Sequence, residues 1–551
     1  VREVLDQASG KIGTAFPGDP LTELPIRRTF VDVYSKLGKP YSALTNAQAA
    51  LALAQLAYGD KDSEPKADTL NDLANCLDSA SRSLEALPIH RQALAMLQRI
   101  HHGDDPGVAK LLAGLAVCQG DIGLPDEALT NFEAALAIYQ RIQPGDNLDV
   151  ADTLYGIANC KYQIGRTAEA VTNFEATLAM FQRIYPGDYP DTATCMGTLA
   201  QCQERIGRYT EALTNFQLSL AMSQRYFRED HPNVADSFSS LAHCQVNLRR
   251  FADALTNNHA AWTMFKRIYQ GDNPRVATAQ ANMALCQARL GMYAESLTNR
   301  EECLAMFRRL HPGDDLSVAI SQDLLADCLD NLGRHAEAAT NFQAALSMGE
   351  RLHSFDDLIM ARDRNRFGDC LNFLGLLDEA RQQYEQALAV YQKRATTSPT
   401  EKSSQVGLAR TRQKLGDLLA ESGRTADALT NYQAGLQLAE AALAIDATDA
   451  DAKALHLTCR IKLGLEKAEV VVHEILPNSQ ALDVGLKAGD VLVSYDGKPV
   501  PCSADLPFLT ARGTGTVIIL DILRDGAPLK LAVNAGPLGS VCEDRSVVKV
   551  N

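Results

Sequence analysis

Several features that assign a protein to a common functional class are scarce in this sequence. No stretch approaches the roughly 18 uninterrupted apolar residues of a membrane-spanning helix, and no basic segment followed by an apolar one opens the chain. Positive charge is in the minority, because 53 Lys and Arg face 68 Asp and Glu and leave a net charge of −15. An acidic surface repels phosphate groups. We therefore expect neither direct membrane insertion nor binding to nucleic acid.

Signatures of catalysis and of metal binding are missing as well. We find no nucleophile motif and no glycine-rich phosphate loop, and the 11 histidines are scattered along the chain. No pair of closely spaced cysteines is followed by a second Cys or His pair, which is the spacing of a zinc site. The sequence therefore predicts a binding protein with no enzymatic activity, no cofactor and no bound metal.

What the sequence does contain is a strict internal repeat. With 551 residues, of which 46% are hydrophobic and 22% charged, the chain has the composition of a folded protein and is too long for one ordinary core. Eight cysteines follow one another at intervals of 42 residues: Cys76, Cys118, Cys160, Cys202, Cys244, Cys286, Cys328 and Cys370. A period of this length indicates stacked units of supersecondary structure, none of which buries its apolar face alone.

Each unit has the pattern of a helix hairpin. Apolar residues recur every three or four positions between Asp149 and Gly165, and again from about Thr167 to Ile184. Gly165 is suited to end the first helix, because glycine adopts a left-handed backbone without a Cβ clash. The sequence therefore predicts a mainly α fold.

Small residues fall where the two helices of a hairpin must approach closely. Most units have an alanine at one such position and an aromatic residue four positions later. The alanines are Ala86, Ala128, Ala170, Ala212, Ala254, Ala338 and Ala380, and the aromatics are Phe132, Phe174, Phe216, Phe342 and Tyr384. This order of glycine, alanine and aromatic residues resembles the tetratricopeptide repeat, and the 42-residue length resembles its kinesin-light-chain subtype. The resemblance implies a right-handed α-solenoid of about ten hairpins over residues 25–460, preceded by a capping segment at residues 1–24.

We interpret the regular cysteines as packing residues. Equivalent positions in neighbouring hairpins are separated by a helix spacing of roughly 8–10 Å, whereas a disulfide needs Cα atoms about 4.4–6.8 Å apart. Cysteine packs as a small hydrophobic residue in such a slot. Because the chain has 13 cysteines and no disulfide pattern, we expect a reducing compartment and hence a cytoplasmic protein.

The concave face is where repeat arrays of this kind bind, and the resemblance implies that the first helix of each hairpin lines it. The candidate residues are Asn75, Asp78, Tyr155, Asn159, Tyr162, Gln201, His243, Asp327, Asp369 and Asn372. The set is rich in amides and carboxylates, and cations are nearly missing around it. We therefore expect a protein partner, presented as a basic or neutral extended peptide, with a merely solvated surface as the alternative.

After a last helix at residues 450–457 the pattern changes from helices to strands. Runs of β-branched and other apolar residues at 470–472, 491–493, 517–523 and 529–533 are separated by turn signals, of which Asp496-Gly497 and Asp525-Gly526 predict hairpin turns. Residues 481–500 contain Gly-Leu-x-x-Gly-Asp followed by Asp-Gly-Lys-Pro-Val, and they resemble the PDZ domain found on bacterial proteases. We therefore expect a small α+β PDZ-like domain over residues 461–536 and a C-terminal tail at residues 537–551.

PDZ domains bind the C-terminus of a peptide by strand addition, with backbone N–H groups holding the carboxylate. The peptide-binding residues that this resemblance implies are Leu463, Gly464, Leu465, Leu506 and Leu509, the last two on a short helix at residues 503–511. Only four residues separate Leu465 from the strand run that begins at Val470. A closed, purely structural PDZ-like domain is therefore the alternative.

Three functions fit these observations. The first is a scaffold or adaptor, in which the solenoid binds one partner and the PDZ-like domain binds the C-terminus of another. The second follows from residues 1–30, which resemble the junction before the repeat array of some bacterial serine/threonine kinases, and from Val1 in place of Met, which suggests an upstream part. In a membrane-anchored kinase the array would be extracytoplasmic. The third is a self-assembling structural protein, because solenoids with unmasked ends can stack into homo-oligomers.

Overall fold

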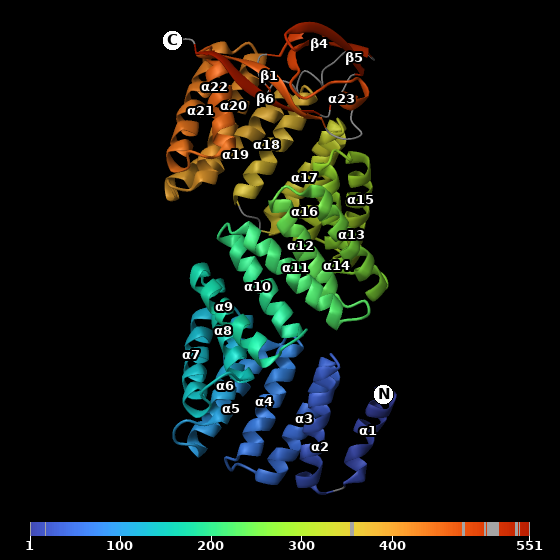
Figure 1. The fold of residues 1–551 in the computed structure, drawn as a ribbon, viewed down its shortest axis with the longest axis vertical. Coiled ribbons are helices and arrows are strands. Elements are labelled where there is room, and N and C mark those ends of the chain that lie inside the picture. Colours follow the sequence, from blue (N-terminus) through green and yellow to red (C-terminus); the bar gives the residue numbers. More distant parts are fainter. Residues whose placement is uncertain are drawn as a thin grey trace. The chain divides into compact units, whose positions relative to one another are not determined.

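A computed structural model describes residues 2–16, 18–352, 357–475, 480–500, 503, 517–534, 538 and 540–549 (Figure 1). The chain divides into two compact units, at residues 1–248 and 249–551. None of the helices in the described part of the chain has the length and apolar character needed to cross a membrane.

The first unit is entirely helical over its described residues. Its helices are α1 (Arg2–Ala15), α2 (Pro20–Lys36), α3 (Pro40–Tyr58), α4 (Glu64–Ser79), α5 (Ser83–Ile100), α6 (Pro106–Asp121), α7 (Pro125–Ile142), α8 (Leu148–Gln163), α9 (Thr167–Ile184), α10 (Pro190–Arg205), α11 (Tyr209–Tyr226) and α12 (Pro232–Asn247). From α2 onward, consecutive helices pack against one another as hairpins. The predicted helix at 167–184 is confirmed as α9. The first hairpin begins at Pro20, earlier than the expected residue 25, so part of the predicted capping segment belongs to α2.

The second unit continues the hairpins and ends in a sheet. Its long helices are α13 (Phe251–Ile268), α14 (Pro274–Arg289), α15 (Tyr293–Leu310), α16 (Leu316–Asn331), α17 (His335–Leu352), α18 (Asp357–Phe373), α19 (Leu377–Thr397), α20 (Lys402–Glu421), α21 (Thr425–Ile445) and α22 (Ala450–Lys462). The last of these confirms the helix expected from residue 450. The tandem helix hairpins of both units confirm the predicted α-solenoid class.

The ends of the helices follow from single residues in the repeat. Gly165 has φ 84° directly after α8, a left-handed backbone that glycine adopts without strain. Pro106 opens α6, where its missing N–H leaves no intrahelical bond unmade. In the preceding residue, the Asp105 side chain accepts a hydrogen bond from the backbone N–H of Val108 and caps the helix.

The close approach of the helices explains the small residues of the repeat. Ala128, Ala170 and Ala212 are fully buried, with no exposed surface, and the ring of Phe174 is buried in the same core cluster as Ala170. Each cysteine of the 42-residue series is buried as well. The thiol of Cys118 donates to the carbonyl oxygen of Ser83, the first residue of α5. The regular cysteines therefore pack as small side chains where one hairpin meets the next.

Burial also makes these thiols unreactive. It raises the pKa of Cys118 to about 12 and that of Cys202 to about 11. At neutral pH both sulfurs keep their protons, and the thiol is a poor nucleophile. The regular cysteines are therefore not candidates for covalent catalysis.

We expect Cys202→Ala to lower the free energy of unfolding by about 1 kcal/mol or less, because only one sulfur leaves a slot in which other repeats of this kind have small residues. Urea denaturation followed by circular dichroism measures this. A loss of several kcal/mol would show that the thiol does more than fill space.

Ion pairs between an arginine and an aspartate join the two ends of successive hairpins. In each, an arginine in the last turn of a second helix forms two hydrogen bonds with the aspartate 37 residues earlier, in the loop before the first helix. The pairs are Arg99–Asp62, Arg141–Asp104, Arg183–Asp146, Arg225–Asp188, Arg309–Asp272 and Arg351–Asp314. The guanidinium holds the pKa of each carboxyl below its ordinary value. Because the pairs are exposed, solvent screens them, and they mainly fix the geometry of the loop.

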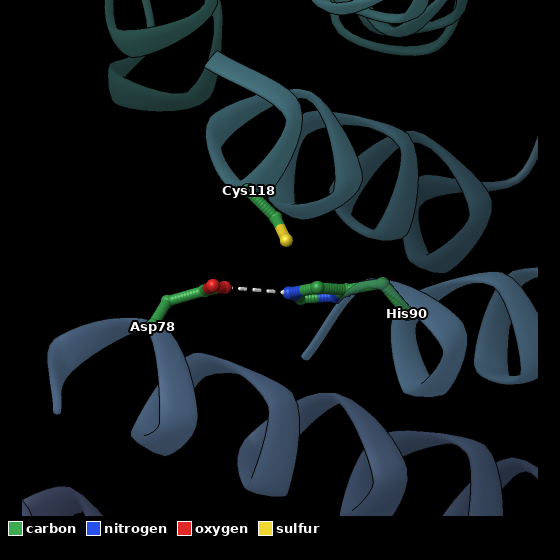
Figure 2. A group of neighbouring side chains, drawn as sticks. All are labelled: Asp78, His90 and Cys118. Carbon is green, nitrogen blue, oxygen red and sulfur yellow. Dashed lines mark hydrogen bonds and ion pairs between the residues drawn. The ribbon is translucent and has the colours of Figure 1, made fainter. Parts of the chain in front are cut away.

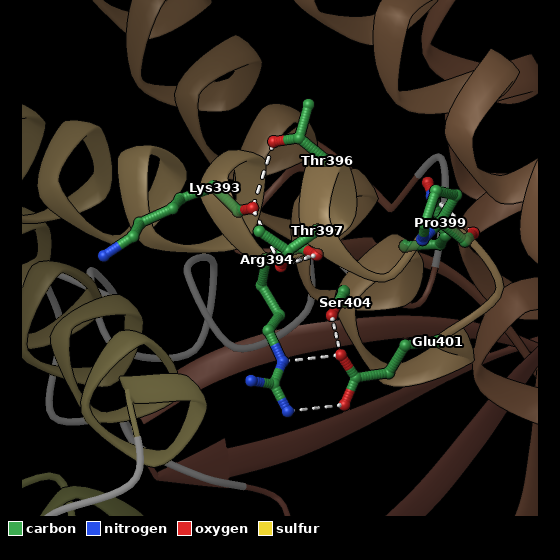
Figure 3. Close-up of polar contacts among 8 residues, drawn as sticks. Lys393, Arg394, Thr396, Thr397, Pro399, Glu401 and Ser404 are labelled. Atoms are coloured by element: carbon green, nitrogen blue, oxygen red, sulfur yellow. Dashed lines mark hydrogen bonds and ion pairs between the residues drawn. The ribbon is translucent and has the colours of Figure 1, made fainter.

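The regular repeat changes after α19. Helices α19 and α21 have 21 residues, whereas the second helices of the hairpins from α5 to α17 have 18. Figure 3 shows the altered connection, in which Arg394 pairs with Glu401, the residue just before α20. The hydroxyl of Ser404 donates to the same carboxylate at 2.9 Å. The ion pair therefore fastens the end of α19 to the start of α20.

The C-terminal domain is an antiparallel sheet with one short described helix, α23 (Gln480–Asp483). Its strands are β1 (Glu466–Ile475), β2 (Val491–Tyr495), β3 (Lys498–Pro499), β4 (Val517–Arg524), β5 (Ala527–Asn534) and β6 (Ser540–Lys549). The order along the sheet is β5-β4-β2-β1-β6, and β3 pairs with β2. The predicted hairpin turns at Asp496-Gly497 and Asp525-Gly526 are confirmed, since both residues of each turn have positive φ.

The prediction of a C-terminal tail from residue 537 is wrong. Residues 540–549 form β6, which pairs antiparallel with β1 along most of that strand's length. The alternation of apolar and polar residues in this segment is weak, so its sequence does not reveal a strand whose stability comes from pairing with a distant partner. The PDZ-like domain therefore extends beyond residue 536. The short helix expected at 503–511 lies outside the described residues, apart from Ser503.

Candidate functional site

The first candidate surface is a pocket of about 650 Å³ lined by α6, α7 and α8, which we call the Asp152 pocket. The lining residues used below are Lys110, Asp121, Asp149, Asp152, Tyr155 and Asn159. Two of the predicted concave-face residues, Tyr155 and Asn159, therefore lie in one pocket. The Tyr155 hydroxyl lies 3.1 Å from the hydroxyl of Thr198 on α10, a hydrogen bond that holds the ring in place.

The electrostatics of the Asp152 pocket are acidic. Burial raises the pKa of Asp152 to about 6, with further contributions from the negative charges of Asp191 and Asp149. Burial, together with Asp78, also raises the pKa of Asp121. Each shift has the direction expected for a carboxylate that is buried near other carboxylates. The pocket therefore offers negative charge that a cationic group of a ligand would stabilise.

The second candidate surface is a pocket of about 530 Å³ lined by α8, α10, α11 and α12, which we call the His243 pocket. It brings together three further predicted residues, Tyr162, Gln201 and His243. The guanidinium of Arg205 lies 5.0 Å from the centre of the Tyr162 ring. The polar residues of this pocket thus come from the first helices of three successive hairpins.

The sequence prediction missed some residues of the His243 pocket. Arg205, Tyr209 and Asn247 also line it. The side-chain amide of Asn247 donates to Glu204 at 2.9 Å, across the gap between α12 and α10. Arg205 follows Gln201 by one helical turn, so helical spacing was the signal that would have found it.

The remaining predicted residues of the first unit lie on α4. Asn75 is exposed, and Asp78 is partly buried. The carboxylate of Asp78 lies 2.9 Å from the Nε2 atom of His90 on α5. Asp78 is therefore already engaged within the protein.

In the second unit the predicted acidic residues have cationic partners. Asp327 lies 3.6 Å from Arg366, and Asp369 accepts hydrogen bonds from Lys414 and from the hydroxyl of Tyr384. The prediction that cations are nearly missing from this face is therefore wrong for the second unit. The sequence did not reveal the contact between Lys414 and Asp369, because the two residues lie 45 positions apart in the chain.

Asn372 was predicted to lie on the concave surface, but only 1% of its surface is exposed. A partner cannot contact a side chain that the fold already encloses. The asparagine therefore belongs to the interior of the second unit, and the assignment to a binding face is wrong.

The structure contradicts the predicted carboxylate cradle in the PDZ-like domain. The backbone N–H groups of Leu463, Gly464 and Leu465 donate to carbonyl oxygens of α22 at 2.9–3.0 Å. Gly464 has φ 71°, and the three residues form the C-terminal cap of that helix. Their donors are satisfied within the chain and are not directed at a ligand.

The described strand order has β5 at one end and β6 at the other. In the described strand order β6 is terminal and covers the side of β1 that faces away from β2. The backbone carbonyl of Leu538, just before β6, accepts from the N–H of Ala481 at 2.7 Å, which ties the start of the strand to α23. The pocket residues Leu506 and Leu509 lie outside the described residues.

Comparison with known proteins identifies the repeats. The family model described as tetratricopeptide repeat matches residues 26–99, 67–141, 149–222, 204–267, 275–351 and 318–393, which together make up more than half of the chain. The chain belongs to the tetratricopeptide repeat family. Tetratricopeptide arrays are scaffolds for protein–protein interaction, and this is the general class of function that the fold indicates.

Solved structures agree with this fold. The apo form of RapI matches 68% of this chain and 97% of its own, with a TM-score of 0.51 and 10% identity. A putative kinesin light chain with nearly identical TPR-like repeats from Podosopora anserina matches 38% of this chain at 18% identity, with a TM-score of 0.35. The TM-score of 0.51 with RapI supports the fold, and at 10% identity that likeness shows the fold alone.

The C-terminal region is similar to proteases that carry PDZ domains. A probable periplasmic serine endoprotease, DegP-like, from Pseudomonas fulva (strain 12-X) is 46% identical over 78 residues, which are 13% of this chain and 16% of that protein. The periplasmic pH-dependent serine endoprotease DegQ from Escherichia coli (strain K12) is 40% identical over 63 residues, 11% of this chain and 14% of its own length. The chain thus spans about one sixth of these relatives, within the PDZ-like region. The comparisons contain no evidence for a kinase.

Proposed function

We propose that this chain is a non-catalytic adaptor whose first unit binds an extended peptide carrying a basic side chain. The observation that carries the proposal is the Asp152 pocket, where three aspartates line a space large enough for a side chain and where Lys110 is the cation among the lining residues. Its volume of about 650 Å³ lies within the usual range of ligand sites.

The raised pKa of Asp152 supports a cationic ligand. Burial and two neighbouring carboxylates disfavour its charged form in the free protein. A lysine or arginine of the ligand placed in the pocket would relieve that repulsion and favour ionisation. Amides such as Asn159, together with the Tyr155 hydroxyl, would bond the peptide backbone beside it.

The test is fluorescence anisotropy of the full chain with extended peptides that contain one lysine, compared with the same peptides in which the lysine is acetylated. We expect Asp152→Asn to weaken binding of the lysine peptide about 10-fold, since one partly desolvated charge pair is lost. Binding of the acetylated peptide should hardly change. The matched control is Glu175→Gln, which removes the same charge from an exposed position on α9 outside the pocket.

The pH dependence of binding gives a second readout. As the pH falls through about 6, Asp152 takes up a proton and the pocket loses negative charge, so affinity for the lysine peptide should fall. In Asp152→Asn this fall should be reduced. Equal affinity of wild type and variant at every pH would refute the proposal for this pocket.

A second binding function is supported by the sheet. We propose that an extended peptide adds as a strand along the outer edge of β6, the terminal strand of the described order. Hydrogen exchange of the full chain with hydrophobic-ended peptides tests this, because protection should appear at backbone amides of β6. Gly464→Val should leave the affinity unchanged, since residues 463–465 cap α22. If Gly464→Val abolishes binding while the domain stays folded, the peptide-binding site lies at residues 463–465 and the proposal for β6 is wrong.

We also propose that the chain works in a reducing compartment. All the cysteines of the described residues are free thiols, and the 42-residue series is buried in hairpin contacts where oxidation would disrupt packing.

A further inference from the structure

A cluster of three metal-ligating side chains lies between the second and third hairpins of the first unit. Asp78 comes from α4, His90 from α5 and Cys118 from α6. Figure 2 shows the Cys118 sulfur directed at the contact between Asp78 and His90 from the opposite helix. One ligand atom from each residue lies within 4.8 Å of the others. The chain therefore gathers a carboxylate, an imidazole and a thiol at one point.

The histidine occupies an unusual position in the repeat. It stands 42 residues before Phe132, in the slot where five later hairpins have a buried aromatic ring. His90 is itself fully buried, with no exposed surface. The imidazole of His90 loses its hydration when it is buried in this slot. Its nitrogen atoms therefore need partners within the protein.

Several polar atoms around this ring have none. Nε2 of His90 lies 2.9 Å from Asp78 Oδ2, but its Nδ1 atom, the Oδ1 atom of Asp78 and the Oδ1 atom of Asn71 are all buried without a hydrogen bond. Nδ1 and Asn71 Oδ1 border the same space, since a Cβ on Gly114 would lie 3.6 Å and 3.3 Å from them. Unpartnered buried groups of this kind are rare in proteins.

A bound cation would give partners to the donor atoms at the centre of this cluster. If a cation binds Nε2, the ring carries its proton on Nδ1, the atom that borders the same space as the side-chain carbonyl oxygen of Asn71. The cation then bonds Asp78 and Cys118 directly. The hydrogen bond between His90 and Asp78 is then replaced by one metal bond to Nε2 and one to the carboxylate.

We propose that Asp78, His90 and Cys118 bind a divalent transition-metal ion, Zn²⁺ being the ion that suits this ligand set. One nitrogen, one sulfur and one carboxylate oxygen are the donor types found around zinc, at bond lengths of about 2.0–2.3 Å. Ligand atoms bonded to one ion at these lengths lie roughly 3.3–3.8 Å apart, so small side-chain movements suffice. The sulfur loses its proton on binding. The ion would fasten the second hairpin to the third.

A second cluster of the same composition provides the matched control. Asp330, His335 and Cys370 also lie within 4.8 Å of one another. There His335 bonds Asp330 at 2.7 Å, and the Cys370 thiol donates to the same carboxylate at 3.2 Å. None of the ligand atoms in this second cluster is among the buried atoms that lack a partner. We therefore expect it not to bind the metal.

The variant that removes a ligand can be chosen to keep the fold. His90→Phe introduces the residue that the next hairpin has at this position. Phe132 packs against Gly156, where a Cβ would lie only 2.4 Å from the ring, and His90 faces the equivalent glycine, Gly114. The space for a phenylalanine ring is therefore present.

The experiment is titration of the full, reduced chain with Co²⁺ as a spectroscopic substitute for Zn²⁺, followed by competition with Zn²⁺. We expect one equivalent of Co²⁺ to produce the charge-transfer band of a cobalt–thiolate bond. His90→Phe and Cys118→Ala should each weaken binding by at least about 10-fold and remove the band, while Cys370→Ala should leave it unchanged. Circular dichroism confirms that each variant is folded.

Zn²⁺ should also raise the melting temperature of the wild type but not that of His90→Phe, since a ligand that binds only the folded state stabilises it. Absence of the band in the wild type would overturn the proposal. A band that persists in Cys118→Ala, or disappears in Cys370→Ala, would also overturn it.

Discussion

Gly156→Ala is expected to destabilise the first unit by about 1–3 kcal/mol, although alanine is the better helix former by about 1 kcal/mol. Gly156 lies within α8, and a Cβ built on it would lie 2.4–2.8 Å from three atoms of the Phe132 ring. The ring is 5% exposed and held by the core of its hairpin, so it cannot move aside without disturbing its neighbours. Overpacking therefore outweighs the gain in helix propensity.

The matched control is Gly197→Ala, the same change in the interior of α10. There a Cβ meets only the Ser219 hydroxyl, at 3.5 Å, which is an ordinary contact. This variant should gain up to about 1 kcal/mol from propensity. Urea denaturation of both variants shows whether each change lowers or raises the free energy of unfolding. Adding Phe132→Leu to Gly156→Ala should recover part of the lost stability. Stabilisation by Gly156→Ala would show that the ring is free to move.

Deletion of residues 540–551 is expected to unfold the C-terminal sheet while the helical hairpins remain. Without β6, strand β1 keeps only its pairing with β2, which involves Val470 and Val471. The apolar core of the domain includes the fully buried Val470 and Val472 of β1, so losing the strand exposes that core. The loss is on the order of 5 kcal/mol, comparable with the whole stability of a small domain.

Hydrogen exchange measured by mass spectrometry separates the two parts of the chain. Amides of β1 and β2 should lose protection in the truncated chain, whereas those of α14–α19 should not. The control is removal of residues 550–551 alone, which leaves every residue of β6 in place. Unchanged protection of β1 after the longer deletion would mean that β6 adds nothing to the domain.

Much of the fold could be read from the sequence because its determinants are local and recur. Cysteines every 42 residues, an alanine such as Ala170 and a ring such as Phe174 four positions later indicate one hairpin, and repetition multiplies the signal. The turn pairs Asp496-Gly497 and Asp525-Gly526 likewise indicate their hairpins, because few other residues adopt positive φ at low cost.

The candidate sites depended on contacts between residues far apart in the chain. Helical spacing predicted that Tyr155, Asn159 and Tyr162 share one face of α8. It did not predict which pocket each residue would line. Asn372 had the same polar character as its neighbours, and only packing decided that it is buried. Composition alone does not determine which carboxylate meets a cation.

The sequence by itself determined the class of this protein: an acidic array of tetratricopeptide hairpins followed by a PDZ-like domain, with no motif of a known enzyme. Tertiary structure decided three further points. It showed that residues 463–465 cap α22, that residues 540–549 complete the sheet, and that Asp78, His90 and Cys118 meet. The physical reason is the same in each case. Helix propensity and turn formation act over a few residues, whereas capping, strand pairing and side-chain clustering depend on which distant segments the fold brings within hydrogen-bonding distance.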